Sequence, residues 1–188
     1  MSQANLNSLI ENLDSQQIEQ QIPAIEETAK IIETLAQKAV AALEDSPNRF
    51  LVAERLNSFG SIITPHLEQL LNKSNNSEVK ILAAFVLLQQ NSQAGISVLL
   101  NAIESDREYA ELAAQHLAAA GIKDAVKSIC DRLRISNLEE IDLIVSLLNS
   151  LKKLDAKLPQ DLWERFSVDD TPWQIKTMCQ DSFSRLIL

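Results

Sequence analysis

Apolar residues recur along the chain with helical spacing, and the stretch from Glu78 to Leu133 repeats its own pattern. Seven apolar residues return 30 residues later: Leu82, Ala83, Ala84, Leu87, Ile96, Leu99 and Ile103 match Leu112, Ala113, Ala114, Leu117, Val126, Ile129 and Leu133. A fixed period of this length is typical of stacked helical hairpins, each too small to bury its own apolar face. The pattern therefore predicts an array of hairpins that share one core.

The same spacing predicts helices on both sides of this stretch. Before it we expect a stripe formed by Leu6, Leu9, Ile10 and Leu13, a short polar helix around Gln16–Gln21, a long helix from Pro23 to about Glu44, and a hairpin over residues 50–71. After it we expect a hairpin whose second helix begins at Pro159, and a closing helix with Ile175, Met178 or Cys179, and Leu186.

Residues with capping preferences mark the boundaries of these elements. Gly60 and Gly121 follow apolar runs, where a left-handed residue often ends a helix. Asp106 is expected to cap the next helix, and Ser136 with Glu139 is expected to form a capping box. The boundaries predict an acidic N-terminal helical cap over residues 1–47 and hairpins over residues 48–188, packed as one continuous domain.

Small residues recur where neighbouring helices must approach closely. Ala84 and Ala114 allow helix axes to lie about 8–10 Å apart, whereas Leu87 and Leu117 fill the space between layers. Leucine at either alanine position is expected to cost about 1–3 kcal/mol by overpacking. Alanine at either leucine position is expected to cost about 2–5 kcal/mol.

Composition favours an all-α fold with an acidic surface. Only 4% of the 188 residues are aromatic, and three glycines and five prolines provide little turn chemistry for sheets. The net charge is −9, and residues 1–48 carry eight acidic side chains and two lysines. Such a chain repels phosphate backbones, so nucleic-acid binding is not expected. The acidic segment is interpreted as a solubilising surface, with a face for a basic protein partner as the alternative.

Chemistry-bearing residues are sparse. Cys130 and Cys179 lie among apolar neighbours, which predicts buried thiols, and neither His66 nor His116 has the spacing of a metal ligand. The three scattered glycines form no phosphate-binding loop, so no catalytic residue, metal or cofactor is predicted. The chain has no signal segment and no apolar run of membrane-spanning length, which predicts a cytoplasmic protein without membrane association.

The repeated Leu-Ala-Ala-x-x-Leu helix, followed by a short turn and a second apolar-striped helix, resembles HEAT repeats. It is most similar to the short HEAT-like repeats of phycobilisome lyases, over about Asn48–Phe166. The sequence departs from that pattern at Gln89–Asn91, where a glycine is expected. The resemblance implies a right-handed α-α superhelix, or α-solenoid, of about four hairpins with an N-terminal cap and a closing helix, whose curved surface binds another protein.

In such a solenoid the second helix of each hairpin lines the concave side. Polar residues away from the apolar stripes are then candidate contacts with a protein partner. These candidates are His66, Gln69, Asn72, Ser97, Asn101, Glu104, Lys127, Asp131, Arg134, Asp161 and Arg165. The alternative for each of them is ordinary surface, because few residues of an interface contribute most of its binding energy.

Three functions are compatible with these observations. The leading hypothesis is a non-enzymatic scaffold or adaptor that binds another protein on its concave face. The second is a subunit of a phycobilin lyase or a pigment-protein chaperone, which the resemblance implies and which would need a second subunit. The third is an immunity or inhibitor protein whose acidic surface blocks a basic toxin.

Overall fold

The computed structural model describes residues 3–106 and 108–183. Within these residues the chain forms eleven α-helices and one 3-10 helix, with no strand, so the predicted all-α class is confirmed. Leu186, predicted to lie on the closing helix, falls outside the described residues. The elements are α1 (Gln3–Leu13), α2 (Ile18–Asp45), α3 (Arg49–Leu56), η1 (Asn57–Ile63), α4 (Thr64–Lys73), α5 (Ser77–Gln89), α6 (Ile96–Ser105), α7 (Ala110–Ala119), α8 (Ala125–Ile135), α9 (Ile141–Lys153), α10 (Gln160–Ser167) and α11 (Trp173–Phe183).

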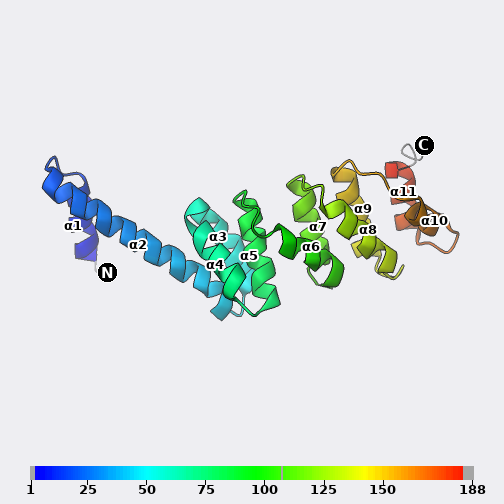
Figure 1. The fold of residues 1–188 in the computed structure, drawn as a ribbon, viewed down its shortest axis with the longest axis horizontal. Helices are drawn as coiled ribbons and strands as arrows, with labels where there is room; N and C mark the ends of the chain where they lie inside the picture. Colours follow the sequence, from blue (N-terminus) through cyan, green and yellow to red (C-terminus); the bar gives the residue numbers. More distant parts are fainter. Residues whose placement is uncertain (1–2, 107, 184–188) are drawn as a thin grey trace.

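The helices form a row along the longest axis of the molecule, with α1 and α2 at one end and α10 and α11 at the other (Figure 1). Helices two apart in the chain pack on one another: α3 on α5, α5 on α7, α7 on α9, and α9 on α11. Contacts also join α6 to α8 and α8 to α10. Each layer therefore rests mainly on its neighbours in sequence.

One continuous core runs through these layers. Leu87, Leu117 and Leu147, on α5, α7 and α9, are completely buried and belong to a single hydrophobic cluster. Ala84 and Ala114 are also completely buried, as the repeated pattern predicted. Small side chains at these positions allow close helix packing, and the leucines occupy the space between layers.

The long N-terminal helix begins earlier than predicted. The expected polar helix around Gln16–Gln21 is not separate, because α2 runs from Ile18 and contains Pro23. The turn before α2 is fixed by Ser15, whose Oγ accepts a hydrogen bond from the Gln17 amide. Proline near a helix start removes a single internal hydrogen bond, and α2 continues for more than five turns beyond it.

Some predicted helix boundaries are confirmed and others are wrong. Gly121 follows α7 with φ of 71°, as expected. The prediction that Asp106 caps the next helix is wrong, because its carboxylate accepts from the Glu108 and Tyr109 amides in the turn before α7, which begins only at Ala110. The predicted capping box does not form, because the Ser136 hydroxyl donates back to the Arg132 carbonyl and α9 begins only at Ile141. Gly60 breaks the helical path within η1, with φ of 64° and ψ of −157°, although α3 itself has already ended at Leu56.

Candidate functional site

The predicted contact residues lie on α4, α6, α8 and α10, the second helices of the expected hairpins. Their side chains are exposed except for three half-buried residues, His66, Asp131 and Arg165. We call this set the second-helix row. The structure groups its members into pairs and triads along successive helices.

Several members of the second-helix row connect one layer to the next. The Arg134 guanidinium lies 2.7 Å from the carboxylates of both Asp131 and Asp161, and this contact lowers the pKa of Asp161. The Arg165 guanidinium donates to backbone carbonyls at the end of α8, where it offsets the negative end of the helix dipole. The Glu104 carboxylate accepts a hydrogen bond of 2.7 Å from Ser128. These charges therefore have structural partners within the chain.

Members of the second-helix row also line two hollows. Ser97 and Asn101 line a hollow of about 320 Å³ beside α5, and Lys127 and Arg134 line one of about 610 Å³ that also reaches Cys130. Lys127 and Asn101 make no side-chain hydrogen bond or ion pair with another described residue. The second-helix row thus offers a few unpaired polar side chains to a partner. Between them lie side chains that already form hydrogen bonds or ion pairs within the chain.

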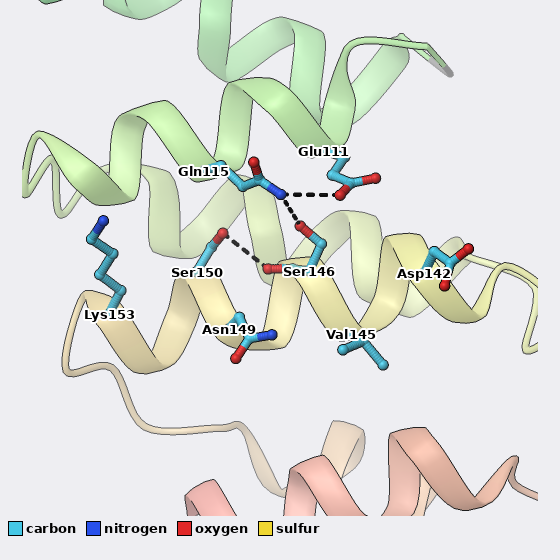
Figure 2. A pocket seen from close by; sticks show the side chains of 8 residues that line it. All are labelled: Glu111, Gln115, Asp142, Val145, Ser146, Asn149, Ser150 and Lys153. Atoms are coloured by element: carbon cyan, nitrogen blue, oxygen red, sulfur yellow. Dashed lines mark hydrogen bonds between the residues drawn. The ribbon is translucent and has the colours of Figure 1, made fainter.

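A further hollow lies between α7 and α9 (Figure 2). It has a volume of about 750 Å³ and lies open to solvent. We call it the α7–α9 groove. It is lined by Glu111, Gln115, Asp142, Val145, Ser146, Asn149, Ser150 and Lys153.

Two serines at successive turns of α9 form the floor of the groove. Ser146 and Ser150 are buried, and their side chains lie on the side of α9 that faces α7 (Figure 2). The Ser150 hydroxyl donates to the Ser146 carbonyl over 3.0 Å, which satisfies it within the helix. The small side chains therefore leave room while keeping polar oxygen atoms at the bottom of the groove.

Gln115 of α7 is held in one orientation above these serines (Figure 2). Its Nε2 donates to the Glu111 carboxylate over 3.0 Å and to the Ser146 hydroxyl over 2.8 Å. Both amide hydrogens are thereby used, so the Gln115 Oε1 is presented as an acceptor. The Ser146 hydroxyl already accepts from Gln115, and its own hydrogen remains to be donated.

The rim of the groove carries opposite charges at its two ends. Glu111 and Asp142 lie at one end, Lys153 lies at the other, and Asn149 stands between them (Figure 2). Asp142, Asn149 and Lys153 form no side-chain hydrogen bond with another described residue. The groove therefore presents the Gln115 oxygen as an acceptor, the Ser146 hydroxyl as a donor, and the Asn149 amide as both donor and acceptor. Its charge changes from negative to positive along its length.

The two thiols and two imidazoles lie outside the groove. The predicted burial of the cysteines is confirmed, and it raises the pKa of Cys130 to about 11 and that of Cys179 to about 12. His116 packs on Phe85 with ring centroids 5.1 Å apart, and burial lowers its pKa. His66 Nε2 lies 3.2 Å from the Glu33 carboxylate and joins α4 to α2.

In the part of the chain that the structure describes, no three or more His, Cys, Asp and Glu side chains converge to hold a metal ion. None of the described helices is both long enough and apolar enough to cross a membrane.

Sequence reasoning missed the α7–α9 groove because it treated α9 as an apolar stripe. The available signal was the pair Ser146 and Ser150, four residues apart within an otherwise apolar helix. Serine at such positions either lies against solvent or bonds back to the preceding turn, and both occur at the edge of a core. The position of Gln115 opposite that pair follows from the packing of α7 on α9.

Comparison with models of known protein families, with curated proteins and with solved structures finds no match for this chain.

Proposed function

We propose that the chain is an α-solenoid of HEAT-like hairpins that acts as a non-enzymatic scaffold and binds an extended segment of another protein in the α7–α9 groove. The row of helices, each packed on its sequence neighbours, supports the solenoid part of this proposal. The observation that carries the binding part is Gln115, anchored at both amide hydrogens above a floor of buried serines.

The chemistry of the groove fits a peptide better than a small apolar molecule. An extended peptide offers one N–H and one C=O group per residue, with a rise of about 3.3 Å per residue, and can therefore pair with the mixture of donors and acceptors on the floor and rim. Small-molecule pockets are mostly apolar and enclosed, whereas this groove is polar and open. The acidic end at Glu111 and Asp142 favours a lysine or arginine at the corresponding end of the peptide.

The state of the thiols supports a binding role over covalent chemistry. A nucleophilic cysteine acts as its thiolate, and burial keeps Cys130 and Cys179 protonated at neutral pH. Pigment attachment through either thiol of the described fold is therefore not favoured. The second-helix row stays a prediction as an additional contact surface.

Comparative capture tests this function. Wild-type protein, Asn149→Trp and Lys152→Glu are immobilised, incubated with lysate of the source cells, and compared by quantitative mass spectrometry. Asn149 and Lys152 are both exposed on α9, but only Asn149 lines the groove. We expect Asn149→Trp to lose a specific partner that Lys152→Glu retains. Equal capture of the same partners by all three proteins would show that the α7–α9 groove is not the binding site.

A further inference from the structure

The N-terminal half of α2 extends away from α3, α4 and α5 (Figure 1). It carries a stripe of exposed isoleucines. The exposed fractions are 69% for Ile18, 52% for Ile22, 53% for Ile25 and 41% for Ile32. Their spacing of four, three and seven residues places them on one face of the helix. Isolated exposed isoleucines are common, but four on a single face form a continuous apolar surface.

This stripe continues a face that is already used for packing. Further along α2 the same face carries Ala36 and Leu43, both buried where α2 meets α3, η1 and α4. Helix α1 packs beside Ala24, about a third of a turn away from the stripe, and the Gln21 amide donates to the Leu13 carbonyl there. The isoleucine face thus continues an internal interface for about five turns, from Ala36 back to Ile18.

Acidic residues border one side of the stripe at regular intervals. Glu19, Glu26 and Glu33 each follow an isoleucine directly and recur every seven residues. In paired helices, residues in this position flank the apolar seam and choose the partner by charge. Glu33 already contacts His66 of α4, whereas Glu19 and Glu26 lie exposed farther out.

The charges exclude two alternative occupants and favour a third. A second copy paired antiparallel would place this glutamate row against itself, and either orientation would bring together two segments of net charge −6. An anionic membrane would repel the same row. A helix with its own apolar stripe and a flank of lysine or arginine would cover the isoleucines and pair with the glutamates.

We propose that the isoleucine face of α2 docks an amphipathic, basic helix of another protein. The bound helix would lie along Ile18–Ile32, as the next helix of the stack, with its cations beside Glu19 and Glu26. This surface lies on a different element from the α7–α9 groove, so the two binding sites are independent of each other.

Fluorescence anisotropy with a defined probe tests the proposal. The probe is a labelled peptide of about 18 residues, roughly five helical turns, with leucine at helical spacing and lysine elsewhere. A matched peptide carries glutamate in place of lysine. We expect the full-length protein to bind the lysine peptide and not the glutamate peptide, with affinity that falls as salt is raised.

Substitutions at exposed positions test whether the isoleucine stripe contributes to peptide binding in addition to the negative charge of the protein. Ile25→Gln is expected to weaken binding roughly tenfold or more, since it removes one buried isoleucine contact. Glu19→Lys with Glu26→Lys is expected to weaken it by at least as much. Ile135→Gln, at a 71% exposed isoleucine on α8, is the matched control and should leave binding unchanged. Circular dichroism checks that each variant retains wild-type helix content.

Three results would overturn the proposal. The first is equal binding of the lysine peptide by wild type, Ile25→Gln and the double charge variant. The second is a wild-type dimer in sedimentation velocity that Ile25→Gln dissociates, which would assign the face to a second copy. The third is co-sedimentation with vesicles containing phosphatidylglycerol that Ile25→Gln abolishes, which would assign it to a membrane surface.

Discussion

Gly95, the N-cap residue of α6, lies directly against Ala84 of α5, and this contact leaves no room for a methyl group. A Cβ at position 95 would lie 2.6 Å from both Cα and Cβ of Ala84, and 3.1 Å from its carbonyl oxygen. Two of these three atoms belong to the backbone of a completely buried helical residue, which has no flexible end to move aside. Gly95→Ala must therefore shift α6 relative to α5.

The expected cost of that shift is about 1–3 kcal/mol of unfolding free energy, the usual range for overpacking a well-packed core. The backbone of Gly95 has φ of −92°, which alanine adopts freely, so conformational strain adds nothing. Moving the methyl group across the contact, in the double variant Ala84→Gly with Gly95→Ala, should restore most of the loss. A residual cost of about 0.5–1 kcal/mol remains for glycine inside α5.

Urea denaturation followed by circular dichroism measures the unfolding free energy of the wild type and of each of these variants. Gly60→Ala is the control, because its φ is 64° but no atom lies within 4 Å of the added Cβ. It should lose about 1–3 kcal/mol through its backbone conformation alone, because φ of 64° with ψ of −157° is essentially restricted to glycine, and Ala84→Gly should not rescue it. The reasoning is refuted if Gly95→Ala is as stable as wild type, or if Ala84→Gly fails to rescue it.

Three further predictions follow from the core and from the buried ionisable groups. Leu117→Ala should lower the unfolding free energy by about 2–5 kcal/mol in the same urea experiment. Wild-type stability of this variant would contradict the role of the buried leucines in the core. Burial and a 3.0 Å hydrogen bond to Glu78 raise the pKa of Tyr109, the single tyrosine, to about 12. The phenolate absorbance of Tyr109 should therefore titrate near pH 12, and a midpoint near 10 would refute this prediction. Because the folded-state pKa is the higher one, the contribution of Tyr109 to the unfolding free energy should be present below pH 10 and lost as the pH rises toward 12. Cys130 and Cys179 should react with a thiol reagent at pH 8 only after denaturation, and rapid reaction of the native protein would show that they are accessible.

The repeated core was predictable because its signal is local and periodic. Leu87 and Leu117 recur at a fixed interval, and burial at that interval follows from helix geometry alone. The start of α2 was not predictable in the same way. Pro23 suggested a new helix, but the turn at Ser15 begins the helix earlier and the proline is accommodated within it.

The binding surfaces depend on packing between helices, which periodicity does not specify. The second-helix row was found as a set of exposed positions, but the pairing of Arg134 with Asp161 depends on how α8 meets α10. The α7–α9 groove requires Gln115 of one layer to stand above Ser146 of the next. Such a contact between layers is visible only once the helices are placed.

Site-specific photo-crosslinking tests the central claim most directly. A benzophenone amino acid is introduced at Asn149, on the rim of the α7–α9 groove, and separately at Asn101, on the second-helix row, since both side chains are exposed. After ultraviolet irradiation in lysate, the account predicts a specific protein adduct from position 149. An adduct from position 101 with none from position 149 would contradict it and place the partner on the second helices.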